Sequence, residues 1–574
     1  MKKKTVSLLL ILCLVFSVFA LASCGKGEKA GAATGDPDAS GSSAADNPSS
    51  ITDKWEIFGS EVSAIAAQNR RFTIEYSQFV APEKIAKNRE YLAGPDESEI
   101  VEGVTPSIQM MVYERNKAAS ELLGTTITYV DWDHDKASWG QAANQIKTLV
   151  QGNASDAPDM FVNMIYDLNL VLLTVGAFKD VTSIPGSYFD FSTDGWMTEW
   201  MNSMSFTGDR AYVLAGDYFL DVLRAMGVLP FNMTMMDANA EKLAPSILGE
   251  GETLGDNEEL TTCFFDVVDQ GKWTWDMLGK LCEAIWEDTD GNGADSIGDR
   301  LGIIADEYGG VSSSIYIYSC GEELIERKPV EDESNPHNGD NWLYYPATPG
   351  VLNDIFDAVA SVFSGQGSFS VKAPIEGSTP DNPGLAYQHI KFGQGELLTA
   401  GACLLAELED DAFQQMRDTY SIVPMPKVNV ESKYNTFVTN TGDAGAINVK
   451  TGPEKTRVIS AYVQYCTEHS AEIREEFLET VTKYKTTTYN QGTARMLDII
   501  YKSVRYGGSK VVEDAVGGNN RWHQMMKGNQ FTMTSSDLAS QYESCRSSKQ
   551  STLNGIIEKW YALPTANSAP EKAE

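Results

Sequence analysis

The feature that most constrains the fold is an alternation of strand and helix patterns between residues 72 and 162. Residues 72–77 alternate apolar and polar side chains, and residues 124–130 are rich in β-branched side chains, as strands are. Helical patterns occupy residues 110–123 and 141–151, and the second ends at Gly152-Asn153, a typical helix stop. Residues 157–162 have the pattern of a third short strand. Strands that alternate with helices indicate an α/β fold with a parallel sheet.

The first 23 residues have the three parts of a secretory signal. Residues 2–4 are lysines, residues 6–20 are almost unbroken apolar side chains, and small residues precede Cys24. The stretch Leu21-Ala22-Ser23-Cys24 resembles a bacterial lipobox, whose cysteine thiol carries diacylglycerol. We therefore expect a signal peptide at 1–23 and a protein held by the lipid on Cys24 at the extracellular face of the cell membrane. The alternative is an uncleaved anchor helix, for which the apolar run is somewhat short.

Composition separates a tether from a folded body and excludes some partners. Residues 25–50 are mainly Gly, Ala, Ser, Asp and Pro and predict a flexible linker, so the folded body begins near Trp55. With 574 residues, of which 42% are hydrophobic, the chain can bury a large core. The formal net charge of -35 argues against nucleic acid, which needs a positive surface. After the leader, no apolar run is long enough to span a membrane.

Cysteine usage leaves the disulfide pattern open. Of eight cysteines, Cys13 lies in the leader and Cys24 is the expected anchor. The remaining six allow about 15 pairings, and the sequence assigns none, so buried free thiols remain an equal alternative. No CxxC motif and no sequence cluster of Cys and His occurs, which argues against zinc.

The later chain continues the alternation of strands and helices. Residues 206–217 predict a turn and an extended run, and residues 229–233 and 420–427 predict strands. Thr274 is a plausible N-cap for a helix whose buried face is Leu278, Leu281, Cys282 and Ile285. The Gly/Ala-rich residues 441–449 run into a helix with the face Val458, Ala461, Tyr462, Tyr465 and Cys466.

Several short motifs follow one another in a recognisable order after Trp55. They are GDRAYVL at 208–214, LPFN at 229–232, TWD at 274–276, FGQGE at 392–396, IVPMP at 422–426 and PE at 453–454. In this order they resemble the extracellular solute-binding proteins of bacterial ABC importers, in the carbohydrate-type group called family 1. Two departures leave the ligand open: Met233 stands where lysine is usual, and residues 210–215 lack the proline of the family.

The resemblance implies a two-lobed, periplasmic-binding-protein-like α/β fold of type II with interlobe crossover strands. Lobe 1 would comprise 55–213 and 442–505, and lobe 2 would comprise 214–441 and 506–565. The lipidated cysteine and linker would occupy 24–54, and 566–574 would form a polar tail. A solute would bind between the lobes and be trapped by hinge closure. The partners would be a small-molecule solute and the ABC permease subunits, and the protein would act as a monomer.

Candidate ligand-binding residues follow from this topology, because ligands bind beyond the carboxyl ends of strands and beside the crossings. Aromatic faces stack on sugar rings, and planar polar side chains bind hydroxyl groups. The candidates are polar or aromatic residues at such positions: Tyr76, Gln78, Asn163, Tyr166, Asp167, Asp217, Tyr218, Asn440, Asp443, Arg521 and Trp522. For each of them the alternative is an ordinary core or surface residue.

One segment matches the spacing of a calcium-binding loop. From Asp288 to Asp299 the sequence fits D-x-[DN]-x-[DN]-G-x5-E, with Asp in the last place. Gly293 would permit the sharp turn at the sixth position. The predicted ligands are Asp288, Asp290, Asn292, the carbonyl of Ala294, Ser296 and Asp299. We expect a structural Ca²⁺ in a lone loop, and the alternative is an Asx/Gly-rich turn without metal.

The sequence carries no recognised catalytic motif. It has no G-x-S-x-G, no HExxH and no P-loop. The predicted function is therefore capture of a solute, most simply a sugar or oligosaccharide, for an ABC importer, without enzymatic activity. A lipid-anchored glycoside hydrolase remains an alternative because paired carboxylates are easily hidden among 80 acidic residues. A binding protein for peptides or another organic solute is the second alternative.

Overall fold

The computed structural model of the chain divides into two units, Met1–Asp53 and Lys54–Glu574. The residues it describes all lie in the second unit: 55–59, 61–67, 91–132, 141–152, 157–206, 208–249, 251–256, 258–306, 315–316, 318–321, 326–329, 341–344, 349–371, 385–409, 411–440, 442–483, 491–505 and 535–565. The predicted strand at 72–77 lies outside these residues.

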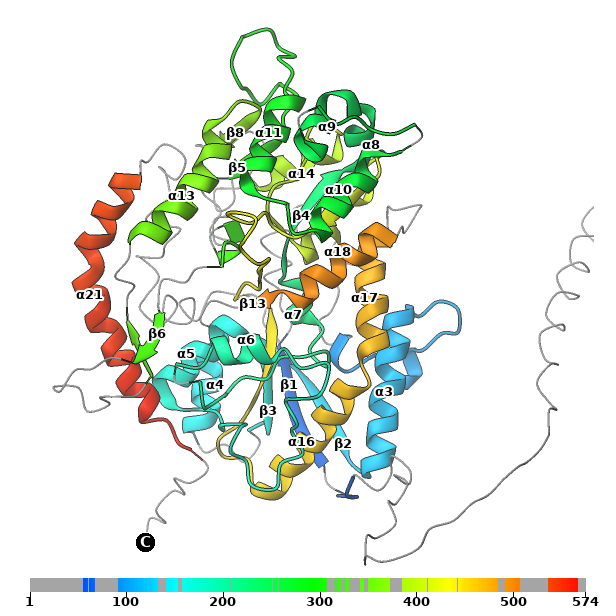
Figure 1. The fold of residues 1–574 in the computed structure, drawn as a ribbon. Helices are drawn as coiled ribbons and strands as arrows, with labels where there is room; N and C mark the ends of the chain where they lie inside the picture. Colours follow the sequence, from blue (N-terminus) through cyan, green and yellow to red (C-terminus); the bar gives the residue numbers. More distant parts are fainter. Residues whose placement is uncertain are drawn as a thin grey trace, which may run out of the picture. The chain divides into compact units, whose positions relative to one another are not determined.

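A four-stranded sheet forms the centre of the first half of this unit (Figure 1). Its strand order is β12-β3-β1-β2, from Asp443–Ile447, Met160–Met164, Glu61–Ala67 and Thr126–Trp132. β1 is parallel to both β2 and β3, whereas β12 is antiparallel to β3. A parallel core of strands connected by helices confirms the predicted α/β class.

Helices pack around this sheet. α3 and α17 contact each other, α16 packs against α3 and β1, and α4 packs against α5, which contacts β3. The helices of this half are η3 Glu97–Glu99, α3 Ser107–Leu123, α4 Gln141–Gln151, α5 Ile165–Val175, α6 Thr198–Ser203, α16 Pro453–Glu468 and α17 Ala471–Lys483. The predicted face of α16, which includes Ala461 and Tyr462, is buried.

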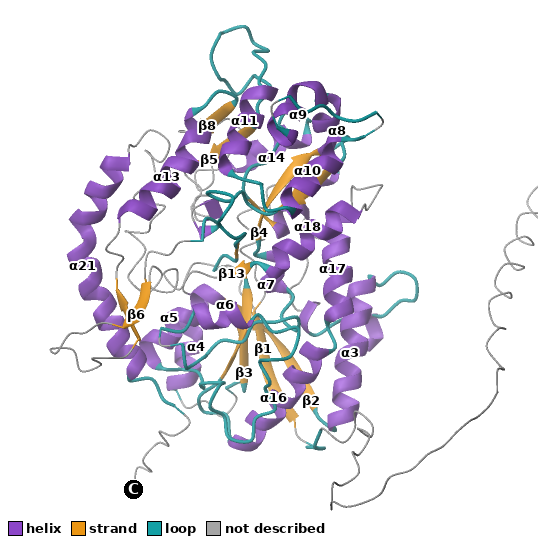
Figure 2. Ribbon diagram, viewed as in Figure 1, coloured by secondary structure: helices purple, strands orange, loops and turns teal. Residues whose placement is uncertain are grey.

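The second half is built on a three-stranded sheet in the order β10-β4-β9. Its strands are Tyr420–Val423, Gly227–Asn232 and Cys403–Leu404, and all their pairings are antiparallel. Three smaller pairs accompany it: β5 Ile303–Asp306 with β8 Ser368–Val371, β6 Glu326–Pro329 with β7 Asn341–Tyr344, and β11 Thr436–Phe437 with β13 Val504–Arg505. Figure 2 shows these strands among the surrounding helices.

One helix of the second half, α11, begins where the sequence indicates. Thr274 accepts a hydrogen bond from the Met277 N–H at 3.3 Å and caps α11, and the predicted face of α11 is buried. The helices are α7 Asp221–Arg224, α8 Met233–Ala238, α9 Ala240–Leu248, α10 Leu260–Asp269, α11 Trp275–Ile285, α13 Pro349–Ser364, α14 Leu385–Gly393, η4 Leu405–Glu409, α15 Asp411–Gln414, α18 Gln491–Lys502 and α21 Ser535–Tyr561.

The chain passes between the two halves several times. After α7 it pairs Met226 with Val438 and then enters β4, and Val438 lies on the return path to β12. α17 packs on α3 in the first half, whereas α18 packs on α10 and β10 in the second. α21 contacts α5 of the first half and α13 of the second. These crossings confirm the two-lobed organisation that was expected.

The sequence did not indicate two of the strands in the first sheet. β1 is EVSAIAA and β12 is DAGAI, and both are rich in small residues that have little intrinsic preference for strands. Tertiary packing explains the small residues in β12, because a Cβ at Gly445 would collide with the ring of Phe219. Leu214 also pairs with Gly445 through two backbone hydrogen bonds of 2.7 and 3.0 Å.

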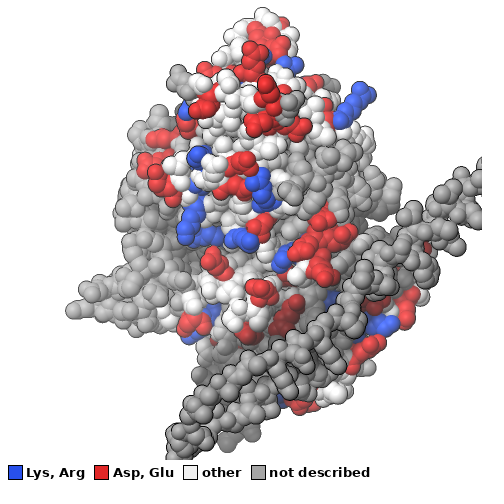
Figure 3. Space-filling model, turned by 45° about the vertical axis from the view of Figure 1, so that its right-hand side comes forward, with Lys and Arg blue, Asp and Glu red and all other residues white. Residues whose placement is uncertain are grey.

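Three further features bear on predictions from the sequence. Cys263, Cys282, Cys320, Cys403 and Cys466 are free thiols. Among the described residues, no helix is both long enough and apolar enough to cross a membrane. On the face shown in Figure 3, acidic and basic side chains lie interspersed rather than gathered into one basic patch.

Candidate functional site

The crossing at β3 and β12 brings together five of the predicted ligand-binding residues. Asn163 pairs with Ala444, and Asp443 pairs with Met164 across the two strands. The Tyr166 N–H donates to the Asn440 carbonyl at 3.0 Å, and Asp167 follows in the first turn of α5. Residues far apart in the sequence therefore meet at the carboxyl end of β3.

Most of these side chains point into the protein. The exposed fractions of Asn163, Asp167, Asn440 and Asp443 lie between 1% and 6%, whereas Tyr166 is half-buried. Asn163 Oδ1 accepts the Met164 N–H at 2.6 Å, and Asp167 Oδ1 accepts the Ala143 N–H at 3.3 Å in the first turn of α4. These groups fix the geometry of the crossing, and Tyr166 is the one among them that solvent reaches. Their role in ligand binding stays a prediction.

The chain first passes from the first half to the second between Leu214, which pairs with Gly445, and the start of β4, and we call this segment the first crossing. Asp217 lies in it, at the centre of a buried network. Its carboxylate accepts hydrogen bonds from Arg474 Nη1 at 2.6 Å and from the Tyr501 hydroxyl at 2.7 Å. The Arg474 guanidinium also lies 4.4 Å from the centre of the Tyr501 ring. Arg474 belongs to α17 and Tyr501 to α18, so one carboxylate links the crossing to helices of both halves.

The electrostatics of this network follow from unequal burial. Burial raises the pKa of Asp217 from 3.8 to about 6, against the opposing influence of Arg474 and Tyr501. Arg474 is less buried, with 18% of its side chain exposed, and the neighbouring Asp217 charge raises its pKa although its own burial works to lower it. The two pKa shifts are compatible because Asp217 loses more hydration than Arg474. Burial therefore dominates the pKa of Asp217, whereas for Arg474 the attraction of its partners outweighs burial.

Tyr218 extends the network toward the edge of the first sheet. Its hydroxyl is hydrogen-bonded to the Tyr129 hydroxyl, and the Arg115 guanidinium lies 4.9 Å from the centre of its ring. Arg115 in turn donates to Ser470 Oγ at 2.7 Å. Burial raises the pKa of both Tyr218 and Tyr462, so these hydroxyls stay protonated.

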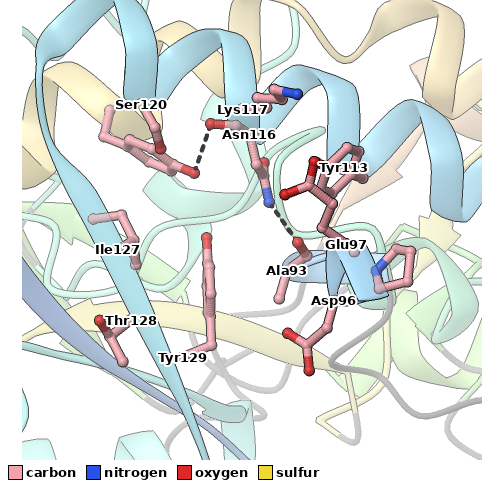
Figure 4. A pocket seen from close by; sticks show the side chains of 13 residues that line it. Ala93, Asp96, Glu97, Tyr113, Asn116, Lys117, Ser120, Ile127, Thr128 and Tyr129 are labelled. Atoms are coloured by element: carbon pink, nitrogen blue, oxygen red, sulfur yellow. Dashed lines mark hydrogen bonds between the residues drawn. The ribbon is translucent and has the colours of Figure 1, made fainter. Parts of the chain in front are cut away.

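A pocket of about 310 Å³ opens beside this tyrosine cluster (Figure 4). It lies between residues 93–97, α3 and β2, and Tyr129 and Tyr462 lie at its base. The pocket is lined by Ala93, Gly94, Pro95, Asp96, Glu97, Tyr113, Asn116, Lys117, Ser120, Ile127, Thr128, Tyr129 and Tyr462. Its carboxylates, amide, ammonium group and tyrosine rings are the groups with which proteins bind hydroxylated solutes.

The sequence analysis did not identify this pocket. Its residues come from one turn, one helix, one strand and a distant helix, and no spacing motif joins them. Conversely, the predicted ligand residues Tyr76, Gln78, Arg521 and Trp522 lie outside the described residues.

The predicted calcium loop has a geometry that suits a cation. Oxygen atoms of Asp288, Asp290 and Asp299 lie within 4.8 Å of one another. Asp288 Oδ2 accepts the Gly293 N–H at 2.8 Å, and Gly293 has a φ of 76°, which a side chain rarely tolerates. The loop lies between α11 and β5, so a strand follows it, as expected for a lone loop.

The remaining loop positions are held by hydrogen bonds to these carboxylates. Ser296 Oγ donates to Asp290 Oδ2 at 2.7 Å, and Asn292 Nδ2 donates to the same oxygen at 2.8 Å. The Ala294 N–H donates to Asn292 Oδ1 at 2.8 Å. Although burial works to raise the pKa of Asp299, hydrogen bonds from the Thr289 and Ser296 N–H groups hold it below its usual value. The loop therefore gathers carboxylate oxygens around one point.

Comparisons with known proteins identify similar folds at low identity. No protein-family model and no curated protein sequence matches the chain. Similar solved structures include the GacH receptor of Streptomyces glaucescens, with 11% identity, a TM-score of 0.42, and coverage of 87% of this chain and 98% of that one. A family 1 extracellular solute-binding protein from Bifidobacterium longum subsp. infantis has 12% identity, a TM-score of 0.40 and coverage of 88% and 99%. An ABC-transporter-associated binding protein from B. animalis subsp. lactis, in complex with β-1,6-galactobiose, has 12% identity, a TM-score of 0.42 and coverage of 86% and 98%.

The raised pKa of Asp217 gives a pH-dependent contribution to stability. The folded state holds this proton more tightly than the unfolded state, so the contribution is full below about pH 4 and is lost as the pH rises through about 6. It amounts to about 3 kcal/mol. We expect the unfolding free energy of the wild-type protein to fall relative to that of Asp217→Asn over this range, measured by urea denaturation. Asp276→Asn on the surface is the control, and parallel curves for wild type and Asp217→Asn would contradict the assignment.

Proposed function

We propose that the chain is the solute-capturing lipoprotein of an ABC importer. The observation that carries the proposal is that two sheet-centred halves are connected by several crossings, with Asp217 linking the first crossing to α17 and α18. Such an arrangement suits a protein that closes on a ligand between two lobes. The ordered motifs of the sequence point in the same direction. The captured solute would pass to the permease, without chemical change, from a monomeric binding protein.

We propose a carbohydrate, in particular a sugar or oligosaccharide, as the solute. The pocket beside Tyr129 is lined by the first half alone and would be that half's part of the site. It offers tyrosine rings together with Asp96, Glu97, Asn116 and Lys117. Planar polar groups satisfy sugar hydroxyls, and aromatic rings cover the apolar faces of sugars. Asp96 and Glu97 are also the observation that keeps a glycoside hydrolase as the second candidate, because glycosidases work with two carboxyl groups.

A solute screen tests this function directly. We expect an oligosaccharide to raise the melting temperature in a concentration-dependent way, with about 2.7 kcal/mol of stabilisation at a hundredfold excess over Kd. Lys117→Ala removes a charged donor from the pocket and should weaken affinity by roughly 10- to 100-fold, whereas the matched exposed Lys147→Ala should leave it unchanged.

The outcomes of the screen separate the alternatives. Stabilisation by peptides and not by sugars would replace the carbohydrate assignment, and release of shortened sugar products would establish the hydrolase instead. Tight sugar binding that is equal in Lys117→Ala and Lys147→Ala would move the ligand site away from this pocket.

We propose that Cys24 carries the lipid that holds the protein at the outer surface of the cell membrane. The leader, the small residues before Cys24 and the polar linker after it support this location. Cys24→Ala should release the protein into the medium, or leave it uncleaved in the membrane, and should abolish incorporation of labelled palmitate. Retention of the label by Cys24→Ala would show that another residue is modified.

We propose a structural Ca²⁺ in the loop Asp288–Asp299. The three carboxylates and the turn at Gly293 support it, because Ca²⁺ prefers a flexible set of oxygen ligands. Calcium at a hundredfold excess over Kd should raise the unfolding free energy by about 2.7 kcal/mol. Asp290→Asn should lose most of this gain, whereas Asp276→Asn on the neighbouring helix should keep it. Equal calcium stabilisation of both variants would rule the loop out.

A further inference from the structure

A second group of metal-binding side chains lies deep in the other sheet. His389 comes from α14, Cys403 from β9 and Glu407 from η4, and one ligand atom of each lies within 4.8 Å of the others. Their exposed fractions are 3%, 0% and 1%, respectively. The sequence argued against zinc because these residues form no spacing motif, and only the packing of α14 against the β9–η4 turn brings them together.

The distances within this cluster suit a tetrahedral zinc site. Cys403 Sγ lies 3.3 Å from His389 Nε2, and Glu407 Oε2 lies 3.8 Å from the same nitrogen. Bond lengths of about 2.0 Å to nitrogen or oxygen and about 2.3 Å to sulfur place tetrahedral ligands about 3.3–3.6 Å apart. The two distances to His389 Nε2 lie within about half an ångström of this range, and all three ligand atoms lie within 4.8 Å of one another.

A buried polar group beside the cluster is an independent sign of a ligand. The hydroxyl of Tyr420, a residue that is 2% exposed, has no hydrogen-bond partner among the described residues. Tyr420 packs against Phe392 and Phe413, and the Phe413 ring lies 4.9 Å from the His389 ring. A buried hydroxyl without a partner is costly unless a ligand or a water satisfies it.

We propose that His389 Nε2, Cys403 Sγ and a carboxylate oxygen of Glu407 bind one zinc ion. A water would occupy the fourth position. Binding requires the thiolate of Cys403 and an unprotonated Nε2 on His389, so it releases the thiol proton to solvent. The thiolate and the carboxylate then balance the two positive charges of the ion, which removes the cost of an isolated buried charge.

The position of the cluster gives the ion a structural role. β9 pairs with β4, and the Leu405 N–H donates to the Met226 carbonyl at 2.9 Å beside the first crossing. η4 also contacts α7 and α17, the helix that carries Arg474. A zinc ion would therefore hold α14, β9 and η4 together next to the first crossing.

Metal content and a cobalt spectrum test the site in the full-length protein. Protein refolded under reducing conditions with Zn²⁺ should retain about one zinc per chain after dialysis. Refolding with Co²⁺ should give a thiolate-to-cobalt charge-transfer absorption, which the oxygen-only calcium loop cannot produce. Cys403→Ser and His389→Gln should abolish this band and weaken zinc binding by at least the roughly 10- to 100-fold that loss of a supporting partner costs.

Cys282→Ser is the matched control, because Cys282 is equally buried but lies outside the cluster. It should keep both the zinc and the cobalt band. Absence of retained zinc in the folded wild-type protein would overturn the proposal and leave a hydrogen-bonded thiol–imidazole–carboxylate network. Retention of zinc by folded Cys403→Ser and His389→Gln would overturn it as well. Circular dichroism of each variant establishes that it has folded.

Discussion

The antiparallel pairing of β12 with β3 is the constraint on which the rest of the structure depends. It joins two segments far apart in the sequence. Most elements of the second half lie between β3 and β12 in the chain, so β12 completes the first sheet after the chain has returned from the second half. The small residues of β12 make this possible, because Phe219 occupies the space that a side chain at Gly445 would need. The first crossing and β12 therefore form one packed unit. Any movement of one half relative to the other would involve this unit.

The Asp217 network adds an electrostatic component to this unit. A fully buried carboxylate is tolerated because Arg474 and Tyr501 both donate to it, and these donors come from successive helices that pack on different halves. Removing either donor would leave a buried charge, which costs far more than an exposed pair contributes. The proposed zinc site includes Glu407 of η4, and η4 contacts α17. Both features would limit how the halves move relative to each other.

Patterns of hydrophobicity and capping predicted much of the fold. α4, the Thr274 cap of α11 and the buried face of α16 follow directly from the sequence, because local periodicity and a side-chain oxygen at the N-cap determine them. β1 and β12 did not, since their alanines and glycines become strand only through neighbours on both sides. Asn163 and Tyr166 lie beside Asn440 in the structure, and their role in ligand binding stays a prediction. The pocket and the His389–Cys403–Glu407 cluster depend on contacts between distant elements, which no spacing in the sequence encodes.

The central claim is that two halves close on a bound solute, and the distance between them tests it most directly. Spin labels on the variants Lys147→Cys in α4 and Lys280→Cys in α11 report on the first and second halves, since both lysines are exposed. The other accessible cysteines are replaced by serine. Double electron–electron resonance should show a shift to a shorter, narrower distance distribution when a sugar saturates the protein. An unchanged distribution in the presence of a bound sugar would contradict the account.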